Sequence, residues 1–225
     1  MNKRFLPKMV FVFILMGVCT TLSYADAWVP VTNFNTWGVT TQGFGTGSVV
    51  PSGAMISLSA NGTSEGGFTG EIAKAETSGF AGVWATLCID IALGNGQLGL
   101  KATIGQVENT LIRVYMYLIE NSGNKGIQFH VEQTDKTTKS SKLIAVGNFG
   151  SWADAWIPGQ SQNVAFARFG SELWFYVDGY KQLHKIQLMD GIEPIAEPDV
   201  GGYISAYAQN VIILGKISDM YLYYE

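Results

Sequence analysis

Proton-transferring side chains alternate with aliphatic ones along two consecutive stretches of this sequence, Thr110–Glu120 and Gly126–Thr134. Read as β-strands, the two stretches each have an apolar and a polar face, since neighbouring side chains point to opposite sides. The polar faces hold Arg113, Tyr115, Tyr117, Gln128, His130 and Glu132. Aromatic rings stack on the C–H surfaces of sugars, while amides, carboxylates and imidazoles bond their hydroxyls. The pattern therefore predicts a sugar-binding face.

A second aromatic face comes from the stretch Ser161–Gly179, which holds two apolar-rich runs joined at Gly170-Ser171. A two-residue Gly-x loop favours a type II′ β-hairpin. The turn would pair Phe166 with Phe175 and Val164 with Val177. One face would then be a core layer, and the other would carry Trp174 and Tyr176. We expect these two rings to share one ligand surface with Tyr115, Tyr117 and His130.

The loop Gly150–Gly159 is a third candidate, because Trp152 and Trp156 flank Asp154 in a segment bounded by Gly and Pro. In an extended conformation both indoles would point the same way and form a stacking platform. The alternative is that one or both rings cap the open end of a β-sandwich.

The rest of the chain indicates an all-β protein. Short strands separated by Gly, Asn, Asp and Pro indicate a sandwich or barrel. A Gly/Thr-rich loop is expected after the first strand, Trp28–Phe34, and through Gly53. No repeat, charge block or linker divides residues 26–225, so a single domain is predicted. The strands expected after this loop are Met55–Ala60, Gly67–Ala73, Gly82–Ala92, Leu98–Ile104, Thr110–Glu120, Gly126–Thr134, Ser141–Val146, the hairpin, Gln182–Leu188, Gly201–Gln209 and Ile217–Tyr224.

The first 25 residues have the features of a signal peptide: a basic head, the apolar run Met9–Leu22, and small residues at Ala25 or Ala27 that suit cleavage. The run is short for a membrane-spanning helix of about 20 residues, although an uncleaved anchor is the alternative. We expect a secreted or periplasmic protein. Only Cys88 would survive cleavage, so no disulfide within the chain is expected. The formal charge of −4 and pI near 5.2, without a basic stripe, argue against nucleic-acid binding.

Two segments resemble a known family. The run NVAFARFGSELWFYVDGYKQLHKIQL (Asn163–Leu188) is similar to the penultimate hairpin of concanavalin A-like lectin/glucanase domains, the laminin G-like group in particular. The terminal run GKISDMYLYY (Gly215–Tyr224) resembles their last strand. The resemblance implies a two-sheet antiparallel jelly-roll sandwich with a concave face that is often used for glycans.

Hydrolases of that superfamily carry E-x-D-x-x-E on one strand, which places an acid and a nucleophile on a common face. This spacing does not occur here. The histidines His130 and His184 are too few for a three-histidine metal site. Calcium remains open, with Asp178, Asp199 and Asp219 as candidate ligands, but no D-x-D-x-D run supports it. No cofactor is therefore assigned.

The sequence thus predicts an exported, non-enzymatic carbohydrate-binding module that uses Arg113, Tyr115, Tyr117, His130, Trp152, Trp156, Trp174 and Tyr176. Two alternatives remain. The first is a protein-interaction or matrix module, because the apolar tail Met220–Glu225 could pair with a partner's strand. The second is a polysaccharide lyase or glycoside hydrolase, for which Arg113, Tyr115, Tyr117 and His130 have suitable chemistry.

Overall fold

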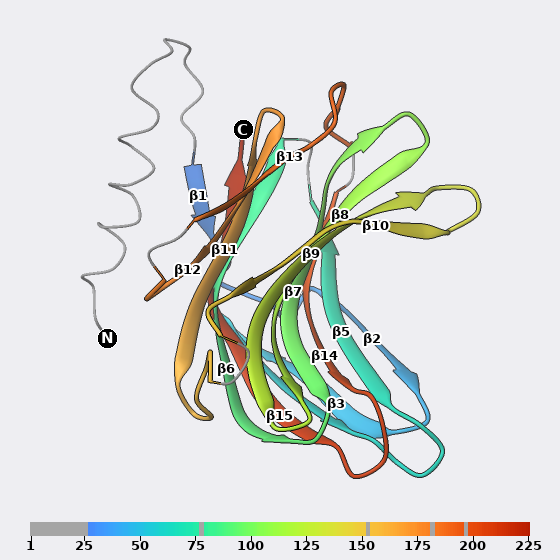
Figure 1. Ribbon diagram of the computed structural model, residues 1–225, viewed down its shortest axis with the longest axis vertical. Coiled ribbons are helices and arrows are strands. Elements are labelled where there is room, and N and C mark those ends of the chain that lie inside the picture. The colour runs from blue at the N-terminus through green and yellow to red at the C-terminus, as the bar shows by residue number, and fades with distance from the viewer. Residues whose placement is uncertain (1–26, 77–78, 152–153, 181–182, 196–197) are drawn as a thin grey trace.

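The computed structural model describes residues 27–76, 79–151, 154–180, 183–195 and 198–225, and these contain strands and turns but no helix. Two antiparallel sheets face each other across a shared core, as the sequence predicts (Figure 1). Sheet A has the order β13-β12-β11-β6-β15-β4-β3, with β1 also paired to β15. Sheet B has the order β10-β9-β8-β7-β14-β5-β2.

The strands of sheet A are β1 (Ala27–Pro30), β3 (Thr46–Ser52), β4 (Met55–Asn61), β6 (Phe80–Leu93), β11 (Ser161–Phe169), β12 (Glu172–Val177), β13 (His184–Gln187) and β15 (Ile212–Tyr224). The strands of sheet B are β2 (Gly38–Gly43), β5 (Phe68–Ala75), β7 (Gly96–Val107), β8 (Thr110–Asn121), β9 (Asn124–Asp135), β10 (Ser141–Phe149) and β14 (Asp199–Ala206).

The hairpin β11–β12 forms in the register that the sequence predicts. Phe166 pairs with Phe175 and Val164 with Val177, and the turn begins at Gly170, whose φ is +57°. The aliphatic face of the hairpin is buried in the core between the sheets. There the ring of Phe175 stacks on Phe129 of β9, with centroids 3.9 Å apart, so this pair joins sheet A to sheet B.

The Gly/Thr-rich segment before Gly53 is not a loop, and the prediction there is wrong. It forms β2 and β3, the edge strands of sheet B and sheet A. All six residues of β2 are exposed, because an edge strand here pairs with one neighbour and leaves both faces unburied. Because β2 has no buried face, its sequence lacks the alternation of apolar and polar residues that identifies a strand.

The tail Met220–Glu225 is not an available edge, which corrects the basis of the protein-interaction alternative. Strand β15 lies inside sheet A, and its last residues pair with β6 on one side and β1 on the other. Trp28 of β1, for example, lies opposite Tyr223. The backbone groups that would receive a partner's strand are therefore already bonded within the sheet.

The predicted signal peptide, residues 1–25, lies outside the described residues, so its cleavage stays a prediction. No helix suited to spanning a membrane occurs among the residues that the structure describes. Cys88 of β6 is buried.

Candidate functional site on the outer face of sheet B

The outward face of sheet B brings four of the predicted residues together. Strands β8 and β9 are neighbours, and their register places Tyr115 opposite His130 and Arg113 opposite Glu132. Tyr117 follows Tyr115 on the same face. These outward side chains are buried or half-buried, which is the shielding expected on the concave side of a curved sheet. We call Arg113, Tyr115, Tyr117, Gln128, His130 and Glu132 the β8–β9 cluster.

A chain of hydrogen bonds crosses this cluster and orients the imidazole. Gln128 Nε2 donates to Asn148 Oδ1 of β10 at 2.6 Å, and the Tyr117 hydroxyl donates to Gln128 Oε1 at 3.2 Å. Tyr117 Oη lies 3.4 Å from His130 Nδ1. Because the single hydroxyl proton of Tyr117 is directed at Gln128, the Nδ1–H tautomer of His130 completes the chain by donating to Tyr117. That tautomer leaves a lone pair on Nε2, which has no hydrogen-bond partner within the described part of the chain.

Tyr115 packs against the face of the His130 imidazole. Its ring lies against the imidazole of His130 with centroids 4.3 Å apart and planes tilted by 33°. Its hydroxyl donates to Glu132 Oε1 at 3.0 Å, so ring and hydroxyl are both held. The imidazole is therefore positioned by Tyr117 at Nδ1 and by Tyr115 along its face.

Burial sets the protonation states in the cluster. It lowers the pKa of His130 below the usual value of 6.5, and the carboxylate of Glu132 opposes this only in part. Burial also raises the pKa of Tyr117 and, together with the charge of Glu132, that of Tyr115. At neutral pH the cluster thus presents a neutral imidazole beside protonated phenols, which is a set that can take up one proton and deliver another.

This protonation pattern makes a pH prediction. If neutral His130 is the proton acceptor, the acid limb of the kcat/KM profile should lie below pH 6.5, because the pKa of His130 is lowered in the folded protein. The free energy of unfolding should also decrease as the pH falls from 6.5 toward that lowered pKa, since the unfolded chain binds the proton more readily there. Initial rates and denaturant titrations across this range would check both. An acid limb above pH 6.5 would contradict the role of His130.

Further polar residues complete this face, although they are not among the site residues predicted from the sequence. Lys101 of β7 lies opposite Tyr115 and forms an ion pair with Glu71 of β5. Tyr203 of β14 lies beside Tyr115, with ring centroids 6.2 Å apart, and is only 4% exposed. Its hydroxyl has no hydrogen-bond partner among the described residues. The signal that could have found Lys101 and Tyr203 is their position on the polar side of strands whose other side is buried.

Carboxylates on this face are too widely separated for an acid–nucleophile pair. Glu132 is on β9 and Asp199 on β14, three strand positions apart, which is about 14 Å at the usual spacing between strands. Glu71 lies four residues along β5 from Ala75, the partner of Asp199, or about 13 Å. Glycosidases place their two carboxyl groups about 5–10 Å apart. Within the described chain no cluster of His, Cys, Asp and Glu could hold a metal ion either.

The predicted single surface divides into two. Trp174 and Tyr176 are on β12 of sheet A, whereas Tyr115, Tyr117 and His130 are on sheet B. Each set points away from the shared core, so the two aromatic faces lie on opposite sides of the sandwich. The expectation that all five contribute to one ligand surface is therefore wrong.

Trp156 is not part of an exposed stacking platform. Trp152 lies outside the described residues. Trp156 is 2% exposed, and its indole N–H lies 3.1 Å from two carbonyl oxygens to which it donates, those of Ile119 and Gly126. This ring therefore caps the sandwich, which is the alternative stated for it above.

No family model matches the sequence, and no curated protein does. Solved structures do match. A 1,3-α-1,4-β-D-galactose-4-sulfate-3,6-anhydro-D-galactose 4-galactohydrolase is 8% identical, with a TM-score of 0.58 over 90% of this chain and 97% of its own. A β-glucanase of Bacillus licheniformis is 14% identical, with a TM-score of 0.54 over 91% and 100%. The family 16 endo-glucanase of Bacteroides ovatus is 12% identical, with a TM-score of 0.56 over 84% and 96%.

This chain has the concanavalin A-like jelly-roll fold. The two-sheet jelly-roll fold that the resemblance implies is thereby confirmed. The comparison also corrects the expectation of a non-enzymatic, lectin-like module, because these similar structures are glycoside hydrolases. At 8–14% identity these structures show the fold of this chain, and its chemistry depends on its own side chains.

Proposed function

We propose that this protein is a polysaccharide-degrading enzyme whose active site is the β8–β9 cluster on the outer face of sheet B. The observation that carries the proposal is the geometry of His130: its Nδ1 lies 3.4 Å from Tyr117 Oη, and its Nε2 has no hydrogen-bond partner within the described chain. Burial lowers the pKa of His130, which favours the neutral imidazole. Similarity to hydrolases of the same fold supports a polysaccharide as the substrate.

The side chains of the cluster suit β-elimination on a uronate-containing polysaccharide. His130 Nε2 takes the proton from the carbon next to the sugar carboxylate. The resulting electron pair forms a carbon–carbon double bond, and the bond from the adjacent ring carbon to the glycosidic oxygen breaks. A tyrosine hydroxyl, that of Tyr117 or Tyr115, protonates the departing oxygen. One proton is taken up and one delivered, so no other reactant is needed.

Arg113 supplies the positive charge that this reaction requires. Removing a proton beside a carboxylate is unfavourable unless the charge that develops there is neutralised. Arg113 lies opposite Glu132 in the register, and its buried Nε has no hydrogen-bond partner among the described residues. Within that part of the chain it also forms no ion pair within 4.0 Å. Its guanidinium can therefore bind a substrate carboxylate in the two-point manner typical of arginine.

Export fits this activity. A polysaccharide is too large to enter a cell intact, so its depolymerase acts outside the cytoplasm. The predicted signal peptide, residues 1–25, would deliver the chain there. We therefore propose a secreted or periplasmic enzyme.

Hydrolysis is the second candidate, and the hydrolases that share the fold favour it. It would use Glu132, the carboxylate of the cluster, to activate a water molecule. Elimination is nevertheless the preferred candidate, because the carboxylates Glu71, Glu132 and Asp199 are too far apart to act as an acid–nucleophile pair.

The test is to incubate the exported protein with alginate, κ-carrageenan and mixed-linkage β-glucan, and to measure two products. Elimination is expected to release new reducing ends from alginate together with ultraviolet absorbance from the unsaturated sugar. Reducing ends without this absorbance would support hydrolysis instead. Release of no reducing ends from any of the three polymers would contradict the proposal of an enzyme.

A further inference from the structure

Tyr203 of β14 is a buried residue of the sheet B face to which the proposed reaction gives no role. It is 4% exposed, and among the described residues its hydroxyl is the one tyrosine hydroxyl that is buried without a hydrogen-bond partner. Such a group usually destabilises a folded protein, because the hydrogen bond to water that it loses is not replaced. An unpartnered donor in the middle of a candidate active site therefore calls for an explanation in the chemistry of that site.

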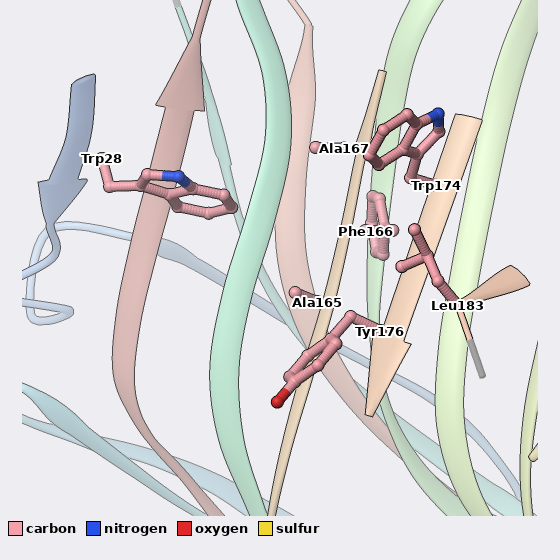
Figure 2. Close-up of a pocket in the computed structure, with 7 residues that line it drawn as sticks. All are labelled: Trp28, Ala165, Phe166, Ala167, Trp174, Tyr176 and Leu183. Atoms are coloured by element: carbon pink, nitrogen blue, oxygen red, sulfur yellow. The ribbon is translucent and has the colours of Figure 1, made fainter. Parts of the chain in front are cut away.

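Other partly buried tyrosines of this chain do have partners. The Tyr224 hydroxyl donates to Glu76 Oε2 at 2.7 Å. Tyr176, on the outer face of sheet A (Figure 2), donates to Asp178 Oδ1 at 3.3 Å. The free hydroxyl of Tyr203 is thus a property of its own position in sheet B.

That position is in one row with Tyr117. Gly99 of β7 lies opposite Tyr117 of β8 on one side and opposite Tyr203 on the other. A Cβ added to Gly99 would lie 2.5 Å from the Cβ of Tyr117, closer than real Cβ contacts. Gly99 therefore has no room for a side chain, and the two tyrosines face each other across it.

Tyr115 is the second neighbour of Tyr203. The two rings meet edge-on, with centroids 6.2 Å apart and planes at 82°. Burial raises the pKa of Tyr203, and a negative charge on Tyr117 or on Tyr115 would raise it further. The hydroxyl of Tyr203 is thus close enough to both of the proposed proton donors to respond to a charge on either one.

The nearest carboxylate does not take up the hydroxyl of Tyr203. Glu71 of β5 lies opposite Tyr203 in the register. Its carboxylate forms an ion pair with Lys101 instead, and Tyr203 Oη bonds to no atom of the described chain. The hydroxyl proton of Tyr203 is therefore available to a new acceptor.

The proposed reaction creates such an acceptor. When Tyr117 or Tyr115 protonates the departing glycosidic oxygen, its own oxygen becomes a phenolate. Burial raises the pKa of both tyrosines, so this negative charge is unfavourable there. A hydrogen bond from a neutral donor stabilises a charged oxygen, and it does so most effectively where water is excluded.

We propose that Tyr203 is a positioning residue of the active site, which donates a hydrogen bond to the phenolate formed when Tyr117 or Tyr115 delivers its proton. This role rests on the proposed function, because it requires that proton transfer. No bond within Tyr203 breaks: its O–H turns toward the new charge. Exchange of protons with water afterwards returns the phenolate and the imidazolium of His130 to their neutral forms.

The test is Tyr203→Phe, which removes the hydroxyl and keeps the ring. On alginate, kcat should fall about ten-fold or more, as expected for a lost hydrogen bond to a charged oxygen. KM should change little, because the bond forms only as the proton is transferred. The urea midpoint should equal or exceed that of the wild type, since the hydroxyl has no partner within the described chain. A purely structural residue would change the midpoint and leave kcat as it is.

Tyr224→Phe is the matched control, because it removes the same atom from a hydroxyl that is bonded to Glu76 on the far side of the proposed site. It should lower the urea midpoint and leave kcat per folded molecule unchanged. Tyr203→Phe is also made in Tyr117→Phe and in Tyr115→Phe. In the variant that lacks the proton donor, loss of the Tyr203 hydroxyl should have little further effect on the rate.

The outcomes separate this role from the proposed function. Wild-type kcat in Tyr203→Phe, from a protein that does cleave alginate, would overturn the role of Tyr203 alone. A ten-fold loss that persists undiminished in both double variants would overturn it as well, since Tyr203 would then act on neither tyrosine. Absence of any product from the wild type would contradict the proposed function, and the role of Tyr203 with it.

Discussion

His130→Ala should reduce the rate of polysaccharide cleavage by about a hundred-fold or more, the effect typical of removing a positioned acid–base group. The position of the His130 imidazole is set by two contacts: Tyr117 at Nδ1 and the ring of Tyr115 along its face. Without it, no other group of suitable pKa occupies this position. The loss should appear in kcat rather than in KM alone, because the proton transfer takes place in the transition state.

The matched control is His184→Ala, which removes the other histidine of the chain. His184 is on β13 of sheet A, where its ring packs edge-on against Phe149 with centroids 4.6 Å apart. We expect this variant to be less stable and to cleave at the wild-type rate per folded molecule. If His130→Ala retains a rate within a few-fold of the wild type, the β8–β9 cluster is not the catalytic site.

The hairpin shows how much of the fold could be predicted from the sequence. A two-residue turn beginning at Gly170 fixes the register, and the period of two then assigns every side chain of β11 and β12 to a face. The observed pairing of Phe166 with Phe175 follows from these two facts alone. Local rules succeeded here because the residues involved are close in sequence.

The division of the aromatic face shows where those rules end. Alternation tells whether a side chain points into the core, but it does not tell to which sheet a strand belongs. Tyr115 and Trp174 both point outward, yet β8 is in sheet B and β12 in sheet A. That assignment depends on pairings between distant strands, such as β11 with β6, which no short motif records.

The same limit explains why the sequence favours a binding module over an enzyme. Carboxylates at a fixed spacing on one strand are the signature of the hydrolases, and this chain lacks that spacing. The β8–β9 cluster instead joins His130 to Tyr115 and Tyr117 across two strands, and its chain of hydrogen bonds extends to Asn148 on a third. The altered pKa of His130 comes from burial, which also depends on the folded sheet.

Phe175→Ala should reduce the free energy of unfolding by about 3–5 kcal/mol, the usual cost of deleting a large buried ring. Phe175 is fully buried, stacks on Phe129 of the opposite sheet with planes 17° apart, and lies 6.2 Å from the ring of Phe166. Its removal would leave a cavity where the two sheets meet, and the surrounding rings are held by their own strands and can close it only in part. The measurement is the midpoint and slope of a urea titration, compared with the wild type at the same pH.

Tyr176→Ala on the same strand is the comparison that gives this result its meaning. Tyr176 points to the opposite face and is partly exposed, so its truncation removes a partly buried hydrogen bond to Asp178 rather than a core contact. Its truncation should therefore cost clearly less than that of Phe175, since its ring contributes less buried area. Equal losses would mean that the outer face of sheet A is as buried as the core. In that case the assignment of one core face and one outer face to β12 would be wrong.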